Sequence, residues 1–265
     1  MRPVDIKSFV EQLAHASGQA ILPFFRSHIG AQDKSAGGVF DPVTEADRAA
    51  ELTMRAMIME QFPSHGIIGE EFGIHNEGAE YMWVLDPIDG TKSFISGLPV
   101  WGTLIGLEHN GAPCYGMMHQ PFTREFFFGD GARSFWHGAK DDGTRRERVL
   151  RTRSCHSLAQ ATLMTTHPQL LIEGTREAFT RVEEKVRLSR YGGDCYAYCM
   201  LASGHIDLVI ESGLNAYDIA ALIPIIEGAG GIITTWTGQS AAKGGSIIAA
   251  GDQHLHDAAL KLLNS

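Results

Sequence analysis

Apolar residues recur at helical spacing over the first part of the chain. Between residues 6 and 25 they return every three or four positions, which predicts a helix with one buried face. The pair Gly37-Gly38 marks a loop, and a second helical pattern runs from Thr44 to about Phe62. We therefore expect the fold to begin with two amphipathic helices.

Short apolar runs replace the helical pattern beyond this point. Ile67-Ile68 is the first, and residues 82–85 predict a buried strand that stops at Asp86-Pro87. Three further strand-like runs follow at short spacing, with glycine or proline between them, at residues 103–107, 114–119 and 125–128. Such spacing is typical of a meander, so this half of the chain predicts an antiparallel sheet.

The pattern changes again after a basic stretch at residues 145–153. Apolar strands then alternate with helical segments, which favours a layered α/β arrangement. The expected strands cover residues 163–165, 186–188, 208–210, 232–234 and 247–249. The expected helices cover residues 174–184, 194–203, 216–229 and 252–263. We place a boundary near residue 150, between an α+β half (1–150) and an α/β half (151–265) that share one interface.

The composition is that of a globular protein, and its charge narrows the range of partners. Hydrophobic residues make up 44% of the 265 positions, charged residues make up 20%, and the formal net charge is −9. An acidic chain of this kind argues against nucleic acid or an anionic membrane as the main partner. If such a protein handles phosphate, it needs metal cations between the two, so the charge hints at metals.

The sequence offers no membrane or targeting segment and no cysteine framework. No stretch reaches the ~20 apolar residues that span a bilayer, and the charged N-terminus lacks the apolar centre of a signal peptide. We therefore expect a cytoplasmic protein. Its four cysteines show neither a disulfide framework nor paired zinc spacing. Cys195 and Cys199 lie four apart in an apolar helical stretch, which predicts small buried thiols.

Candidate chemistry centres on Asp86 and Asp89, at the end of the expected strand. Pro87 fixes the backbone between them, and Gly90 permits a tight turn after them. Such a turn aims both carboxylates into one space, where two unpaired carboxylates would repel each other. A divalent cation removes that conflict, and hard oxygen ligands suit Mg²⁺. The carbonyl of Ile88 also lies within reach of such an ion.

The simpler alternative is a β-turn that merely favours aspartate, proline and glycine. The residues that follow speak for the metal hypothesis. Gly90 and Thr91 offer backbone N–H groups and a hydroxyl at a predicted helix start, which is a natural anion site. Carboxylates for a metal beside amides for an anion are what metal-assisted phosphoryl chemistry requires.

Other acidic residues each allow two interpretations from the residues alone. Glu70 and Glu71 follow a short apolar strand, yet adjacent glutamates are usually a solvated face. Asp218 begins a long apolar helical segment, where a carboxylate is favourable through the helix dipole alone. Asp47 closes the run Thr44-Glu45-Ala46-Asp47, which has the form of a capping box. Glu70, Asp218 and Asp47 are each a candidate for the metal or catalytic site.

Taken together, these segments resemble the inositol monophosphatase family. The resemblance covers nearly the whole chain, and its motifs occur in the family's order: residues 41–47, 69–71, 86–91 and 216–220. It implies a layered α-β-α-β-α sandwich that combines α+β and α/β parts. It also implies a homodimer, a small phosphate ester as substrate and Mg²⁺ as cofactor, with two or three ions.

The resemblance also implies roles for individual residues. One Mg²⁺ would be held by Glu70, Asp86 and the Ile88 carbonyl. A second would be held by Asp86, Asp89 and Asp218, and Glu70 would help place a third through water. Thr91 and Asp47 would orient and deprotonate the attacking water, while Gly90 and Thr91 bind phosphate. No serine or cysteine nucleophile with a base partner stands out, which favours direct attack by water. The expected substrate contacts are Glu70, Ile88, Asp89, Gly90, Thr91, Arg190, Gly193, Asp194, Glu211 and Asp218.

The second half of the chain carries the clues to the substrate. Residues 192–198 and 211–218, with Tyr217 where inositol-type members usually have tryptophan, resemble the histidinol-phosphate phosphatases of the family. If Asp194 and Glu211 both face the substrate, two carboxylates line its organic half, and a protonated amine would offset their desolvation. Asp194 is alternatively a helix N-cap. Arg190 matches a substrate-contacting arginine of the family.

Two alternatives remain beside histidinol phosphate hydrolysis. Among enzymes, the alternative is an inositol-1-phosphate phosphatase or another small-metabolite phosphatase. A nucleotide bisphosphatase would require a richer basic patch. Outside enzymes, the alternative is a metal- or phosphometabolite-binding protein on the same fold. The intact water-activating pair of Thr91 and Asp47 argues against the last, since a pure binder need not keep it.

Overall fold

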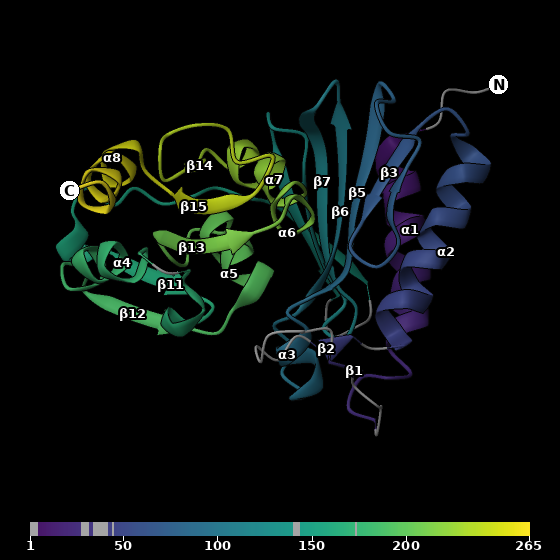
Figure 1. Cartoon of the computed structure of the whole chain (residues 1–265), viewed down its shortest axis with the longest axis horizontal. Coiled ribbons are helices and arrows are strands. Elements are labelled where there is room, and N and C mark those ends of the chain that lie inside the picture. Colours follow the sequence, from purple (N-terminus) through teal and green to yellow (C-terminus); the bar gives the residue numbers. More distant parts are fainter. Residues whose placement is uncertain (1–4, 28–31, 34–41, 44, 140–143, 173) are drawn as a thin grey trace.

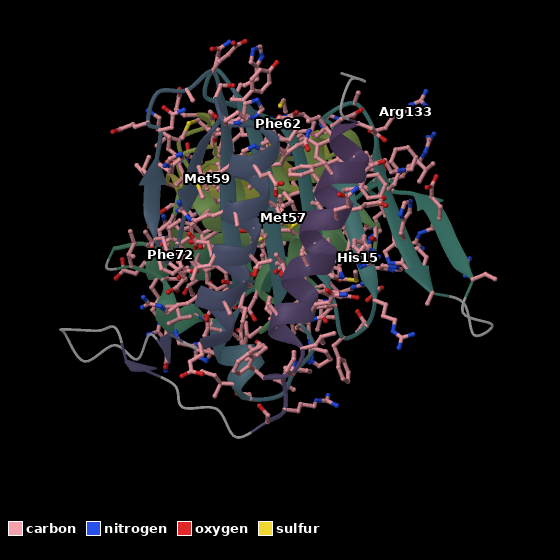
Figure 2. All side chains as sticks on the ribbon, turned by 90° about the vertical axis from the view of Figure 1, so that its right-hand side faces the viewer. His15, Met57, Met59, Phe62, Phe72 and Arg133 are labelled. Carbon is pink, nitrogen blue, oxygen red and sulfur yellow. The ribbon has the colours of Figure 1, made fainter. Side chains whose placement is uncertain are left out.

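The outermost layer consists of the two helices expected at the start of the chain. The computed structural model describes residues 5–27, 32–33, 42–43, 45–139, 144–172 and 174–265. Helix α1 (Ile6–Ile21) begins at Asp5, whose carboxylate accepts a hydrogen bond from the Lys7 N–H at 3.2 Å. Helix α2 (Glu45–Gln61) lies beside it, and Figure 2 looks onto this pair. Both helices are confirmed, while the expected loop at Gly37-Gly38 and the helix start at Thr44 lie outside the described residues.

The first large sheet lies under these helices. Its strand order is β10-β9-β8-β7-β6-β5-β3-β4, and all neighbours are antiparallel except β3 and β5. The antiparallel meander is therefore confirmed, and strands β9 and β10 extend it beyond the prediction. The strands are β3 (Gly66–Gly69), β4 (Gly73–His75), β5 (Tyr81–Asp89), β6 (Gly102–His109), β7 (Ala112–Gln120), β8 (Glu125–Gly129), β9 (Ser134–Ala139) and β10 (Arg145–Val149). A separate two-stranded ribbon pairs β1 (Gln32–Asp33) with β2 (Pro42–Val43).

The second sheet has the order β12-β11-β13-β15-β14 and mixes parallel with antiparallel neighbours. Its strands are β11 (Thr162–Thr165), β12 (Leu188–Tyr191), β13 (Leu208–Leu214), β14 (Ile232–Thr235) and β15 (Gly245–Ala250). All five were expected, but β12 begins at Leu188, two residues later than the apolar pattern suggests. The helical elements of this half are η1 (Leu158–Gln160), η2 (Pro168–Leu170), α4 (Arg176–Glu183), α5 (Asp194–Ala202), α6 (Ala216–Ile219), α7 (Leu222–Gly228) and α8 (Gln253–Leu263).

The expected single helix over residues 216–229 is wrong, because the chain breaks between α6 and α7. Pro224 explains the break: in a continuous helix it would offer no N–H to the Ala220 carbonyl, and its ring would clash there. The break lies directly against β7. A Cβ atom at Gly116 would come within 1.9 Å of the Ala221 carbonyl oxygen, so glycine permits this close approach.

Helices and sheets alternate in five layers, as Figure 1 shows from right to left. Helices α1 and α2 cover the first sheet, α5 and α7 lie between the sheets, and α4 and α8 cover the second. The central apolar core contains Phe127, Tyr198, Ile225 and both Cys195 and Cys199, which confirms the buried thiols. The boundary near residue 150 stays a prediction. In the part of the chain that the structure describes, no helix combines the length and apolar character needed to cross a membrane.

Candidate metal and phosphate site

Strand β5 carries Asp86 and Asp89 on an irregular segment. The expected stop at Asp86-Pro87 is wrong, since β5 continues to Asp89, but its register against β6 shifts between the two aspartates. Pro87 has no N–H for the ladder, which accounts for the irregularity. Its carbonyl accepts a hydrogen bond from Thr103 Oγ1 at 2.8 Å. In a regular strand residues three apart face opposite sides, so this irregularity lets both carboxylates share one face.

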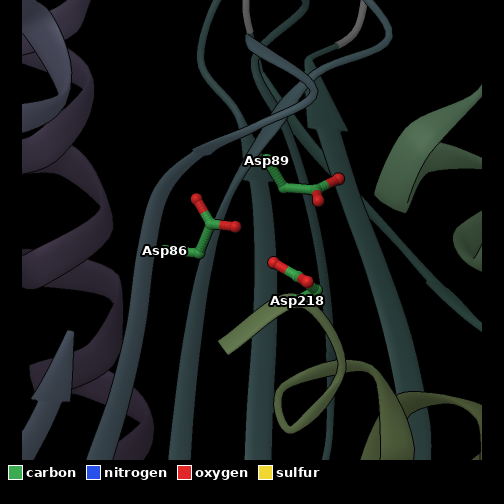
Figure 3. A group of neighbouring side chains, drawn as sticks. All are labelled: Asp86, Asp89 and Asp218. Atoms are coloured by element: carbon green, nitrogen blue, oxygen red, sulfur yellow. The ribbon is translucent and has the colours of Figure 1, made fainter. Parts of the chain in front are cut away.

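Asp218 joins them from the second half of the chain. Ligand oxygens of Asp86, Asp89 and Asp218 lie within 4.8 Å of one another, and Figure 3 shows the carboxylates gathered around one space. Asp218 also belongs to a capping box, in which its Oδ2 accepts a hydrogen bond from the N–H of Asn215 at 2.6 Å. The two interpretations of Asp218 are therefore compatible: one carboxylate caps α6 and faces the cluster.

Crowding makes this cluster electrostatically costly without a cation. Burial raises the pKa of Asp86 well above that of an ordinary aspartate, and the carboxylates of Glu70 and Asp89 raise it further. Burial and the carboxylates of Asp194 and Asp218 likewise raise the pKa of Asp89. A hydrogen bond from the Cys195 N–H at 2.6 Å opposes the rise at Asp89.

The cluster fits a divalent cation. Asp86 is 1% exposed, and within the described residues its Oδ1 is a buried atom without a hydrogen-bond partner. A cation would bind this oxygen and remove the repulsion among the three carboxylates. An all-oxygen set of this kind favours a hard ion over the softer metals that cysteine and histidine select.

A buried glutamate holds the backbone next to Glu70. Glu51 on α2 is 0% exposed, and its carboxylate accepts hydrogen bonds from the N–H groups of Glu71 at 2.7 Å and Phe72 at 3.2 Å. Arg55 donates to the same carboxylate at 2.7 Å. The Glu70 N–H donates to the Leu85 carbonyl at 3.2 Å, which ties Glu70 beside Asp86. Sequence reasoning missed Glu51, although a Glu–Arg pair four apart on the buried side of a helix is a usable signal.

Three more candidate residues lie near the cluster: Asp47 on α2, and Gly90 and Thr91 directly after Asp89. Asp47 lies in the first turn of α2, is 2% exposed, and contributes to the raised pKa of Asp86. Thr91 begins the short helix α3 (Thr91–Ile95), and its hydroxyl donates to the Ile88 carbonyl at 3.3 Å. Gly90 has φ +89°, which glycine adopts without strain. A Cβ at Gly90 would also come within 2.8 Å of the Asp194 carboxylate.

A cleft of about 260 Å³ extends from the aspartates into the second half of the chain. Its lining includes four carboxylates, those of Asp89, Asp218, Asp194 and Glu211. Asp194 has φ +43° and accepts a hydrogen bond from Ser93 Oγ at 2.6 Å. It is the first residue of α5, and the N-cap position expected for it belongs to Gly193. An adjoining hollow shares Asp194, Thr166 and His167 with the cleft.

Six of the ten expected substrate contacts are not among the described residues that line this cleft: Glu70, Ile88, Gly90, Thr91, Arg190 and Gly193. Arg190 is exposed on β12, the edge strand of the second sheet, and Gly193 is buried beside Met164. Neither is among the described residues that line the cleft or the adjoining hollow. Their roles in binding substrate stay predictions. Sequence reasoning also missed Ser93, which holds Asp194, and Thr166 and Tyr198, which hold Glu211.

Comparisons with known proteins identify the family. The model of the inositol monophosphatase family matches residues 4–265. A bifunctional phosphatase of Arabidopsis thaliana chloroplasts, IMPL2, is 47% identical over 95% of this chain and 72% of its own length. A histidinol-phosphatase of Mycobacterium tuberculosis is 36% identical over 84% of this chain and 85% of its own. The structure of an inositol monophosphatase from Zymomonas mobilis superimposes with a TM-score of 0.84 and 40% identity over 97% of both chains. The chain therefore belongs to the inositol monophosphatase family of metal-dependent phosphoric monoester hydrolases.

Proposed function

We propose that this enzyme hydrolyses L-histidinol phosphate to L-histidinol and phosphate with the help of Mg²⁺. The observation that carries the proposal is the pair of carboxylates, Asp194 and Glu211, in the cleft that begins at the aspartate cluster. A substrate that fits both ends must present a phosphate to one and a positive charge to the other. An amino alcohol phosphate has this form.

At the metal end, Glu70, Asp86 and the Ile88 carbonyl are our candidates for one Mg²⁺. Asp86, Asp89 and Asp218 are the candidates for a second, and Glu70 would act on a third ion through water. When bound, these ions polarise the phosphoryl oxygens and neutralise the charge of the leaving alkoxide. The oxygen set and the unpartnered Oδ1 of Asp86 support this assignment.

The chain's own groups would handle the water and the phosphate. We assign Asp47 and Thr91 to orient the attacking water and accept its proton, and the N–H groups of Gly90 and Thr91 to bind phosphate. Water gives up one proton and bonds to phosphorus, the bond from phosphorus to the ester oxygen breaks, and that oxygen takes a proton from solvent water and leaves as the alcohol. The hydrogen bond from Thr91 to the Ile88 carbonyl supports this role, since it fixes the hydroxyl beside the cluster.

At the organic end, the ammonium group would lie between Asp194 and Glu211. Burial raises the pKa of both carboxyls, while hydroxyl donors such as Ser93 and Thr166 oppose the rise and favour the charged forms. Two buried anions gain more from a cationic substrate than from a neutral polyol, because the cation offsets their desolvation. This argument favours histidinol phosphate over inositol phosphate, whose hydrolysis is the second candidate because relatives of both names match the chain.

Parallel phosphate-release assays with Mg²⁺ test the proposal. We expect kcat/KM for L-histidinol phosphate to exceed that for myo-inositol 1-phosphate by at least roughly tenfold, the gain of one well-placed charge pair. Equal or reversed values would overturn the histidinol assignment and leave inositol phosphate as the substrate. Tight binding by isothermal titration without phosphate release from either ester would instead indicate a binding protein. A homodimer and a cytoplasmic location stay predictions.

A further inference from the structure

Glu211 is held by more hydrogen bonds than a solvated glutamate needs. It lies on β13, is 7% exposed, and accepts hydrogen bonds from the Thr166 N–H at 2.9 Å and the Thr166 hydroxyl. The hydroxyl of Tyr198 donates to its other oxygen at 2.9 Å. Donors on both oxygens leave this carboxylate little rotational freedom, so its direction toward the cleft is set by its neighbours.

Tyr198 differs from Thr166 in its access to the cleft. Thr166 lines the cleft and is able to touch a substrate directly, whereas Tyr198 is 2% exposed and packs in the core between the sheets. Burial and the neighbouring Glu211 carboxylate raise the pKa of the Tyr198 phenol well above its ordinary value. The phenol therefore keeps its proton and acts as a donor to Glu211.

Helix α5 connects Tyr198 to the rest of the site. Asp194 opens the helix, and Tyr198 follows four residues later, so both side chains leave the same face one turn apart. Between them, the Cys195 N–H donates to Asp89 at 2.6 Å. One helix thus contacts the aspartate cluster through the Cys195 N–H, carries Asp194, and holds Glu211 through Tyr198.

We infer that Tyr198 is a positioning residue for substrate selectivity, acting through Glu211. Its hydroxyl fixes Glu211 at a set distance from Asp194, so that a primary ammonium group fits between the two carboxylates. The inference rests on the proposed function and adds to it that selectivity depends on a side chain outside the substrate's reach. Without the hydroxyl, Glu211 would turn within its buried space and lose its alignment with Asp194.

The chain offers a matched control on the same helix. Tyr196 donates from its hydroxyl to Glu125 at 2.7 Å, so it forms a similar tyrosine–glutamate hydrogen bond at a partly buried position. Glu125 begins β8 in the first sheet and also accepts from Trp136 at 2.9 Å. Neither Tyr196 nor Glu125 lines the cleft. Tyr196→Phe therefore reports the cost of losing such a bond where no substrate is involved.

The experiment compares the full-length wild type, Tyr198→Phe and Tyr196→Phe with L-histidinol phosphate and myo-inositol 1-phosphate at saturating Mg²⁺. For Tyr198→Phe we expect KM for the cationic ester to rise roughly tenfold, with kcat and the KM for inositol phosphate changed by less than about threefold. Tyr196→Phe should leave both KM values within about twofold of wild type. Thermal unfolding of all three proteins separates a loss of stability, common to both variants, from the loss of selectivity.

A double-mutant cycle with Glu211→Gln then tests the route of the effect. If Tyr198 acts through Glu211, Tyr198→Phe should change the KM for histidinol phosphate by less than about twofold in the Glu211→Gln background. Equal KM changes for both esters, or a full tenfold effect in that background, would overturn the inference. A wild type without preference for the cationic ester would overturn the proposed function instead. Preference in the wild type that survives Tyr198→Phe would overturn the inference about Tyr198 alone.

Discussion

Two groups of carboxylates meet at the cleft, a metal end formed by the aspartate cluster and a substrate end formed by Asp194 and Glu211, and they are held in different ways. At the metal end, Asp86, Asp89 and Asp218 bring ligand oxygens within 4.8 Å of one another. At the substrate end, Asp194 and Glu211 are each fixed by hydroxyl groups from other elements. The first arrangement concentrates negative charge, whereas the second surrounds each charge with donors.

The difference shows in what raises or lowers each pKa. Burial raises the pKa of Asp86 and of Glu211, but at Asp86 the further contributions are neighbouring carboxylates, which raise it again. At Glu211 the next contributions are hydrogen bonds from Thr166 and Tyr198, which lower it. Crowding of carboxylates favours a divalent cation, while hydrogen bonds to a carboxylate favour its charged form, which a single organic cation would pair with. The distinction predicts different results for the same type of substitution at the two ends.

The largest effect is expected from Asp89→Asn, which removes one charge from the metal end. Loss of a ligand costs several kcal/mol of transition-state stabilisation, so kcat should fall by roughly a thousandfold or more. The metal-free protein should keep its fold and stability, since the substitution also removes a source of repulsion. Phosphate-release assays and circular dichroism measure both, and retained turnover would contradict the role of Asp89.

Thermal unfolding with and without Mg²⁺ provides the control for this substitution. Mg²⁺ at about a hundred times its Kd should raise the Tm of the wild type by several degrees, because it binds the folded state alone. The rise should be much smaller in Asp89→Asn and only slightly smaller in Asp194→Asn, whose carboxylate neighbours Asp89. An equal loss in both variants would show that the cleft acts as one acidic cluster.

The metal end could be predicted from the sequence because its residues lie in short motifs at element ends. Asp86, Asp89 and Gly90 fall within one turn, and proline and glycine show where the strand becomes irregular. The helix-dipole interpretation of Asp218 was also correct, since it caps α6. Local patterns left its place in the aspartate cluster open, and the order of motifs in the family indicated it.

The supports of the substrate end were beyond the reach of local patterns. Thr166 lies 45 residues from Glu211 within the second half, and Ser93 lies 101 residues from Asp194 in the other half, so only tertiary packing brings each pair together. A buried tyrosine such as Tyr198 is read from sequence as ordinary core. The helix break before Pro224 was missed for a related reason, because apolar periodicity continues through it. Local periodicity therefore predicted most elements, while contacts between distant segments required the structure.

A smaller effect is expected from Asp194→Asn, which removes a charge from the substrate end. KM for histidinol phosphate should rise roughly tenfold, while KM for a neutral ester should change by less than about threefold. The amide oxygen still accepts the hydrogen bond from Ser93, so the pocket should keep its shape. Steady-state kinetics with both esters measure the difference. If both KM values respond alike, the charge-matching argument fails and the contrast between the two ends disappears.

The last prediction tests whether acid destabilises the protein through a group outside the cleft. His119 on β7 faces α1, is 3% exposed, stacks on Phe126 at 4.2 Å, and has its pKa lowered to about 3 by burial and by His15. An unfolded histidine titrates near 6.5, so the stability gained by burying neutral His119 is complete above that pH and decreases as pH falls toward 3. Between pH 7 and pH 5 this should cost the wild type roughly 2 kcal/mol, and His119→Gln should lose less over the same range. Urea unfolding of both proteins in EDTA measures the change, and the cleft carboxylates cancel in the difference because both proteins contain them. Parallel pH curves would mean that acid acts elsewhere in the molecule and that His119 has no part in it.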